Sequence, residues 1–254
     1  MFRIILISQV NLRNRKLFRS IYYMKSFLKL GLTAIAITLF FNAFAVTETK
    51  AQNDIRNEIL KRMETNRNTM QTLRSNVTMV KYDSVLKESD TLQGKTIYLP
   101  TKGRDALVRI DWTKPEEILS VVNGKYVLYR PRLKQAIVGN VKEAKGSGKA
   151  NGALSFMNMS KDQLRANYTI KYLGQENVSS GTLTWRLELT PKAATNFKTA
   201  ELWVDSNGMP IQAKINESNN DTTTVLLSDF EKNADINASQ FEVKLPKDTK
   251  IIKG

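Results

Sequence analysis

Residues 200–215 read AELWVDSNGMPIQAKI, and this stretch predicts a β-hairpin. Apolar and polar side chains alternate on both sides of Asn207-Gly208, and both of these residues tolerate the positive φ angles of a two-residue turn. Such a turn places three apolar pairs on one face of the hairpin: Ala200 with Ile215, Leu202 with Ala213, and Val204 with Ile211. The other face, which includes Glu201 and Lys214, is mostly polar. The hairpin therefore fits a sheet that has one face in water and one face against a core.

The same alternation with a period of two continues through most of the chain. It is clear in residues 183–189 and again in residues 241–245. A second Asn-Gly pair, Asn123-Gly124, also lies between two alternating runs and predicts another hairpin. Roughly ten strands of this kind predict a large antiparallel sheet whose apolar face must be covered.

Two segments can supply that cover. Residues 53–73 predict an amphipathic helix, because apolar residues recur close to every fourth position and acidic residues occupy the first turn. A short helix is predicted to begin after its cap, Ser160, and to end near Arg165. It follows a glycine-rich stretch, residues 146–152, which suits either a surface loop or a hinge for the apolar segment 153–159.

Two helices are little cover for so many strands, so we expect the sheet to curl around an interior that side chains do not completely fill. The predicted fold is α+β: an incomplete antiparallel β-barrel, or half-barrel, with an apolar concave face covered by an N-terminal helix and a short lid helix. The alternative is a fully packed core, since small sheets can close on themselves. A partly filled interior would suit a lipid, and its candidate lining and lid residues are Leu154, Phe156, Met157, Met159, Leu164, Trp112, Leu202, Val204, Ile211 and Ile215.

The first 45 residues have the organisation of an export segment. From Met24, two lysines precede an apolar run over residues 30–44, and Ala43-Phe44-Ala45 is a small-x-small cleavage site. We therefore expect a signal peptide over residues 24–45, upstream read-through over residues 1–23, a single domain over residues 46–254 and a periplasmic location. An alternative cut follows residue 51. The competing interpretation is an anchoring helix, for which the apolar run is short.

The composition of the 254-residue chain narrows its chemistry. It has no His and no Cys, which excludes thiol nucleophiles, imidazole bases, disulfides and zinc sites built from these residues. Gly94-Lys95-Thr96 lacks the rest of a phosphate-binding loop. The carboxylate pairs Glu116-Glu117 and Asp229/Glu231 suit solvated positions better than acid–base catalysis. We expect no enzymatic activity, no metal and no cofactor.

The net charge of +15 is unevenly distributed. Residues 1–45 hold seven basic residues and no acidic one, so 15 − 7 = +8 remains for residues 46–254. A charge of this size suits approach to anionic headgroups or to an acidic partner, and we expect no nucleic-acid partner. The absence of Cys also means that the chain has no residue to carry the acyl chains of a bacterial lipoprotein.

Several motifs occur in the order and spacing of one protein family. They are Val108-Arg109-Ile110-Asp111-Trp112 with Pro115-Glu116, Asn123-Gly124-Lys125 through Tyr129-Arg130-Pro131 to Gln135-Ala136, Leu189-Thr190-Pro191-Lys192, the hairpin 202–215 with Asp221-Thr222-Thr223, and Phe241 with Leu245-Pro246. From about Ile55 to its last residue, the chain resembles the LolA-like family of periplasmic carriers of outer-membrane lipoproteins.

This resemblance implies a half-barrel carrier with three kinds of partner. It would receive acylated lipoproteins from an inner-membrane ABC transporter, shield their acyl chains in an apolar cavity and pass them to an outer-membrane receptor. The resemblance also implies an arginine that latches the lid helix, and Arg104 and Arg109, both ahead of Trp112, are the candidates. We expect a monomer. The alternative function is a periplasmic lipid- or lipoprotein-sensing regulatory module of the same fold.

Overall fold

The computed structural model describes residues 50–101, 106–141 and 154–254, without the side chains of Met157 and Asn158. Its contacts divide the chain into two units, Met1–Asn53 and Asp54–Gly254. In the first unit the described residues, 50–53, are helical. The second unit contains every strand of the described chain.

Twelve strands form one open sheet in the order β12-β6-β5-β4-β3-β2-β1-β11-β10-β9-β8-β7. Their bounds are β1 (Leu73–Asp83), β2 (Glu88–Leu99), β3 (Leu107–Thr113), β4 (Glu116–Val122), β5 (Lys125–Arg130), β6 (Gln135–Asn140), β7 (Tyr168–Asn177), β8 (Leu183–Pro191), β9 (Phe197–Val204), β10 (Pro210–Glu217), β11 (Thr222–Lys232) and β12 (Lys250–Lys253). All neighbours are antiparallel except β12, which pairs in parallel with β6. The α+β class with a large open sheet is confirmed, and the prediction of a purely antiparallel sheet is wrong.

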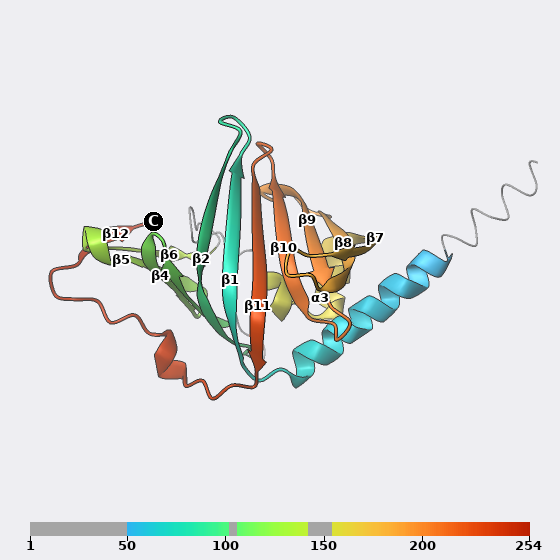
Figure 1. Cartoon of the computed structure of the whole chain (residues 1–254), viewed down its shortest axis with the longest axis horizontal. Coiled ribbons are helices and arrows are strands. Elements are labelled where there is room, and N and C mark those ends of the chain that lie inside the picture. Colours follow the sequence, from blue (N-terminus) through green and yellow to red (C-terminus); the bar gives the residue numbers. More distant parts are fainter. Residues whose placement is uncertain (1–49, 102–105, 142–153) are drawn as a thin grey trace, which may run out of the picture. The chain divides into compact units, whose positions relative to one another are not determined.

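The sheet consists of two meanders that meet at one seam. Strands β1 to β6 follow one another from the middle of the sheet to one side, and β11 back to β7 follow one another to the other side. The seam is the pairing of β1 with β11, which Figure 1 shows side by side. Because the last strand returns to the far side of the first meander, the segment between β11 and β12 must pass along one face of the sheet.

The two predicted hairpins form with different turns. Asn123 and Gly124 both have positive φ, at 52° and 74°, and join β4 to β5 as the two-residue turn expected for an Asn-Gly pair. The second connection is longer, because β9 ends at Val204 and β10 begins at Pro210. Its turn is closed by the Asp205 side chain, whose Oδ1 accepts hydrogen bonds from the backbone N–H groups of Asn207 and Met209.

The longer turn changes only part of the predicted register. Ala200 still pairs with Ile215 and Leu202 with Ala213, as expected. Val204 pairs with Pro210 rather than with Ile211, because the register shifts between Pro210 and Gln212. The bulge absorbs the extra turn residues and keeps the rest of the hairpin on its predicted face.

The long helix ends earlier than its apolar pattern predicts. Residues 50–69 are helical, and Leu73 is already the first residue of β1. The cause is a distant residue, Asn233, whose Oδ1 accepts from the backbone N–H of Gln71 and whose own N–H donates to the carbonyl of Thr72. These bonds hold residues 71–72 in the connection to β1, so these two residues do not continue the helix. The helix still buries Ile59, Leu60 and Met63 of the predicted stripe, whereas Ile55 near its start is 40% exposed.

One face of the sheet, called here the inner face, carries a continuous apolar core. The core takes buried side chains from β1 to β5 and from β7 to β11, together with the helical residues Ile59, Leu60 and Met63. Alternation within a strand identifies the face: Val108, Ile110 and Trp112 of β3 are buried, whereas the residues between them are more exposed. The inner face therefore spans both meanders.

Part of the opposite, outer face is also buried. After β11 the chain places Ala234, Ile236 and Phe241 in a second apolar cluster, which packs against outward side chains that include Ile97 and Leu107. The predicted strand over residues 241–245 is wrong, since Phe241 ends a short 3-10 helix, η5 (Ala238–Phe241), and an extended coil follows. Its apolar alternation reflects burial of single side chains rather than strand pairing.

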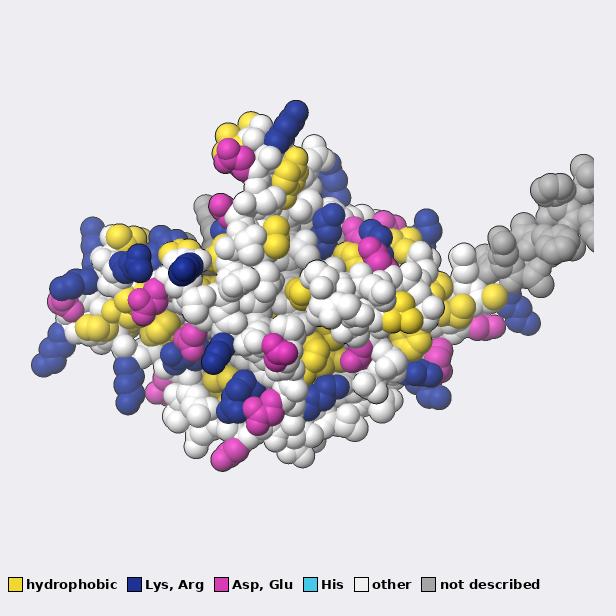
Figure 2. All heavy atoms as spheres, in the orientation of Figure 1, with side chains coloured by type: hydrophobic (Ala, Val, Ile, Leu, Met, Phe, Trp, Pro, Cys, Tyr) yellow, Lys and Arg dark blue, Asp and Glu magenta, His cyan; other side chains and the backbone are white. Residues whose placement is uncertain are grey.

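Within the described residues, no helix combines the length and the apolar character that crossing a membrane requires. On the face shown in Figure 2, Lys and Arg side chains are interspersed with Asp and Glu and do not gather into one basic patch.

Candidate functional site

The inner face brings together most of the side chains predicted to line a cavity or a lid. Seven of them are buried and belong to the same core: Trp112, Leu154, Phe156, Leu164, Leu202, Val204 and Ile211. Met159 and Ile215 are half-buried and pack against that core. The Met157 side chain and the whole of Arg104 lie outside the described part of the chain. Nine of the ten predicted lining and lid residues therefore belong to one core or pack against it, and they come from elements far apart in the sequence.

A short segment, residues 155–167, contributes the lid candidates and is called here the η4–α3 segment. It consists of η4 (Ser155–Asn158) and α3 (Lys161–Asn167). Phe156 of η4 lies in the core, and its ring centroid is 5.8 Å from that of Tyr168 on β7. Leu164 is the buried residue of α3. Two apolar side chains thus anchor the segment on the inner face.

The start of α3 is stabilised as the sequence predicts. Ser160 is its N-cap and forms a capping box with Gln163: the Ser160 Oγ accepts from the Gln163 N–H, and the Gln163 Oε1 accepts from the Ser160 N–H. Seven residues are too few for a stable isolated helix, so α3 depends on this cap and on its contacts.

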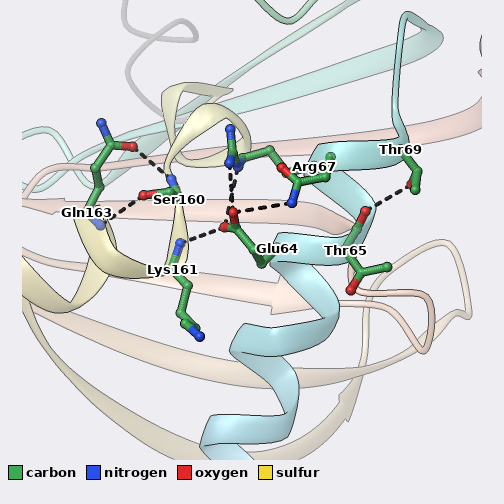
Figure 3. Close-up of polar contacts among 8 residues, drawn as sticks. Glu64, Thr65, Arg67, Thr69, Ser160, Lys161 and Gln163 are labelled. Atoms are coloured by element: carbon green, nitrogen blue, oxygen red, sulfur yellow. Dashed lines mark hydrogen bonds and ion pairs between the residues drawn. The ribbon is translucent and has the colours of Figure 1, made fainter. Parts of the chain in front are cut away.

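Glu64 of the long helix joins that helix to α3 (Figure 3). Its carboxylate accepts a hydrogen bond of 2.8 Å from the backbone N–H of Lys161, the first residue of α3, and one of 2.7 Å from the Arg67 guanidinium. The hydrogen bond from Arg67 lowers the pKa of Glu64, burial opposes this shift, and the Lys161 N–H adds to the lowering. The carboxylate is therefore charged near neutral pH and holds the helix start by a charge-assisted bond.

Further polar contacts join α3 to the long helix and attach both elements to the strands and turns beside them. Arg165 of α3 donates to the Oδ1 of Asn57, and its carbonyl accepts from the Lys192 ammonium at 2.6 Å. Arg62 of the long helix donates to the carbonyl of Ser206 and lies 5.2 Å from the centroid of the Trp185 ring. The cover of the inner face is thus held by a small number of identifiable side chains.

Arg109, one of the two latch candidates, lies on the outer face. It pairs with Asp111 at 3.0 Å and donates to the carbonyls of Gln240 and Glu242, which flank Phe241. Ser120 also donates to the Phe241 carbonyl. The structure does not bring Arg109 to α3, and it assigns this side chain to the attachment of the C-terminal segment. Arg104 stays a prediction.

Sequence reasoning missed Glu64 as the contact to α3. One signal was present, since Ser160-x-x-Gln163 marks the start of a helix whose N–H groups attract a carboxylate. Its partner could not be identified, because the long helix carries several acids and their distances to Lys161 depend on the whole fold.

Three polar atoms on the inner face have no hydrogen-bond partner among the described residues: Ser75 Oγ, Tyr98 OH and Trp112 Nε1. All three side chains are buried. Burial raises the pKa of the Tyr98 hydroxyl, and the positive charge of Arg67 opposes that shift, so the hydroxyl is protonated and can donate.

Comparison with known proteins places this arrangement in a family. Residues 101–244 match the family described as outer membrane lipoprotein carrier protein LolA, which is more than half of the chain. The chain belongs to the LolA family. This confirms the resemblance inferred from the motifs between Val108 and Phe241. No curated protein matches the sequence.

Several solved structures resemble this LolA family protein at low sequence identity. An uncharacterised conserved protein from Thermus thermophilus is 15% identical, with a TM-score of 0.49, over 78% of this chain and 99% of the other. A LolA superfamily protein from Nitrosomonas europaea is 15% identical, with a TM-score of 0.39, over 74% and 97%. The lipoprotein LppX of Mycobacterium tuberculosis is 13% identical, with a TM-score of 0.38, over 71% and 98%.

Proposed function

We propose that this LolA family protein is a periplasmic carrier that binds the acyl chains of lipoproteins on its inner face and transports them from the inner to the outer membrane. The observation that carries the proposal is the inner face itself, an apolar surface drawn from both meanders and covered by the long helix and the η4–α3 segment. In this proposal the sheet acts as a half-barrel, and the η4–α3 segment acts as its lid.

The energetics favour a protected transfer of this kind. Moving one acyl chain of an ordinary lipid into water costs on the order of 10 kcal/mol, at about 0.8 kcal/mol for each CH₂ group. A carrier therefore needs apolar surface rather than catalytic groups. The residues proposed to contact acyl chains are those of the inner face named above, with Phe156 and Leu164 on the lid side and Leu202 and Ile211 on the sheet side.

The attachment of the η4–α3 segment suits a lid. Its apolar anchors, Phe156 and Leu164, lie in the same core that an acyl chain would enter, so a bound chain would replace their contacts. Its polar attachment includes the bond from the Lys161 N–H to Glu64. Opening would therefore expose the inner face without breaking a strand pair. Arg104 is proposed as an additional latch, in line with the family resemblance.

The proposal includes the route of the protein and its partners. Residues 24–45 would direct export as a signal peptide, an inner-membrane ABC transporter would supply the lipoprotein, and an outer-membrane receptor would accept it. The protein would act as a monomer, without a cofactor and without enzymatic activity. The positive charge of residues 46–254 supports approach to anionic headgroups.

A binding experiment with residues 46–254, which include the whole of the second unit, tests the proposal. We expect saturable binding of a fluorescent fatty acid and release of lipoprotein from loaded inner-membrane vesicles. Phe156→Ala should weaken probe binding about tenfold, because it removes an aromatic ring from the inner face. As a control, Val85→Ala with Leu86→Ala, at an exposed hairpin tip, should leave binding unchanged. Absence of both binding and release would refute the carrier, and binding without release would favour a lipid sensor.

A further inference from the structure

The inner face contains three buried polar groups that the apolar core does not satisfy. Ser75, Tyr98 and Trp112 are 3%, 2% and 2% exposed, and their Oγ, OH and Nε1 atoms have no hydrogen-bond partner in the part of the chain that the structure describes. A buried polar group left without a partner costs about 1–3 kcal/mol, and such groups are rare in native proteins. Three of them on one face therefore suggest a ligand that completes their bonding.

The three residues lie on neighbouring strands, one on each of β1, β2 and β3. The register gives three successive rows across these strands on the inner face: Leu73 with Tyr98 and Val108, Ser75 with Thr96 and Ile110, and Val77 with Gly94 and Trp112. Ser75 is thus in the row between those of Tyr98 and Trp112. Gly94 lies between Val77 and Trp112, and a Cβ there would be 3.0 Å from the Trp112 Cα, so the backbones of β2 and β3 approach closely beside the indole.

The chemistry of these groups selects an acceptor. The indole N–H can only donate, and the two hydroxyls can donate as well. The other hydroxyl in these rows, Thr96 Oγ1, already donates to the carbonyl of Arg109 at 2.9 Å. Hydrocarbon has no acceptor, so these donors need a polar oxygen, which an otherwise apolar ligand can carry.

The charge of the surroundings favours a neutral oxygen over a carboxylate. Among the described residues no Lys or Arg is buried, so a carboxylate carried into this face would lose its hydration without gaining a buried counter-charge. Arg67, whose charge acts on Tyr98, is already paired with Glu64. An ester or amide carbonyl avoids this cost.

We infer that Ser75, Tyr98 and Trp112 form a subsite for the ester or amide carbonyl oxygens by which acyl chains are attached to their parent molecule. This subsite deepens the proposed function and rests on it. It selects acylated molecules over plain hydrocarbon and places the head end of a bound chain at β1–β3, while the hydrocarbon covers the apolar remainder of the inner face.

Matched lipid probes test the subsite. Residues 46–254 are titrated with a fluorescent monoacyl glycerol ester and with the alkyl glycerol ether of the same chain length, which lacks the carbonyl. We expect the ester to bind about tenfold more tightly, the effect of one or two net hydrogen bonds. Tyr98→Phe combined with Trp112→Phe should bring the ratio of ester affinity to ether affinity close to one, whatever the change in the affinity for the ether itself.

Two controls separate the subsite from a general structural effect. Trp203→Phe removes an indole donor on the outer face, where Nε1 donates to Glu176, and it should keep the preference for the ester. Tyr98→Phe alone should leave the melting temperature of the unliganded protein equal or higher, because the lost hydroxyl had no protein partner.

Equal binding of ester and ether by the unmodified protein would overturn the subsite and leave the carrier intact. The same holds if the double variant keeps the preference, or if Tyr98→Phe lowers the melting temperature by several degrees, since the hydroxyl would then have a structural partner. Failure of both probes to bind would overturn the proposed function together with the subsite.

Discussion

Replacement of Glu64 by Ala should loosen α3 without unfolding the sheet. The carboxylate, 27% exposed, accepts from the Lys161 N–H and from Arg67, and neither donor finds an equivalent acceptor in Ala. A hydrogen bond to a charged group contributes about 1.5–3 kcal/mol, and partial exposure lets water replace some of it. We therefore expect the free energy needed to open α3 to fall by about 1–2 kcal/mol, which corresponds to about a 5- to 30-fold larger open population.

Hydrogen exchange of single amides measures this opening directly. The Leu164 N–H donates to Ser160 and the Tyr168 N–H to Leu164, so both report on α3. Their exchange should accelerate by the factor above, whereas amides at the β1–β11 seam should not change. The matched control is Glu58→Ala on the same helix. Within the described part of the chain Glu58 pairs only with exposed Arg62, at 2.9 Å, and such a pair contributes little.

Two results would refute this reasoning. If Glu64→Ala and Glu58→Ala leave the exchange of Leu164 equally unchanged, the bond to Lys161 does not hold α3. If Glu64→Ala instead accelerates exchange throughout the sheet, the carboxylate contributes to global stability and is no local attachment. Glu64→Gln should lie between the wild type and Glu64→Ala, since an amide oxygen can still accept from the Lys161 N–H.

Four further predictions concern other contacts. The pKa of Glu64 is lowered, so its carboxylate stabilises α3 fully above the ordinary pKa of 4.5 and loses this effect as the pH falls through the lowered pKa. Hydrogen exchange at the Leu164 amide should therefore accelerate only below pH 4.5. Arg109→Ala should weaken attachment of the C-terminal segment by about 1 kcal/mol and speed limited proteolysis of that segment. The control Arg74→Ala, which breaks an exposed pair with Glu231, should not. Equal proteolysis rates in the two variants would exclude the role assigned to Arg109. Gly208→Ala should lower the free energy of unfolding in denaturant by about 2 kcal/mol or more, because φ is +81° and a Cβ would lie 2.7 Å from the Met63 backbone N. The control Gly181→Ala, with open space around it, should lower it by about 1 kcal/mol. Similar losses in the two variants would mean that the long helix moves to accommodate the Cβ of residue 208. Arg104→Ala should alter lipoprotein release with folding intact, and unchanged transfer kinetics would remove Arg104 from the mechanism.

Local chemistry made the hairpins predictable. Asn123-Gly124 contains all that its turn requires, so the two-residue connection follows from the sequence alone. The Asn207-Gly208 pair has the same letters but forms a different turn, because the Asp205 side chain accepts two backbone bonds and Gly208 alone takes a positive φ. The pairing of Leu202 with Ala213 survived, since burial of one face determines register more strongly than turn length does.

Features that depend on distant residues were not predictable. The long helix stops early because Asn233, 162 residues from Gln71, competes for its last backbone groups. The alternation after Phe241 has the period of a strand, yet the outer face of β3 and β4 takes up the Phe241 side chain as a single anchor. The parallel pairing of β12 with β6 likewise depends on the path of residues 233–249 over that face.

The candidate site divides in the same way. Membership of the inner face was predictable for Trp112, Leu202 and Ile211, because strand alternation assigns each side chain to a face. The contact of Glu64 with Lys161, and the placement of Arg109 on the outer face, depend on which elements lie next to each other in space. Strand alternation alone could have placed Arg109 on the outer face, since it lies between the buried residues Val108 and Ile110 and must point away from them.

The β1–β11 seam makes folding of this sheet a late event. Leu73 pairs with Lys232 and Tyr82 with Thr222, whereas the other antiparallel pairs join strands that are consecutive in the chain. Each meander can form by local pairing, but β1 keeps an unpaired edge until β11 is available, and closure of so long a loop slows the final step. During that interval an open strand edge is exposed beside two half-formed cores, which is the condition under which chains aggregate or recruit chaperones. A fold that we propose to shield the apolar chains of other molecules thus passes through a stage in which its own apolar surface is unprotected.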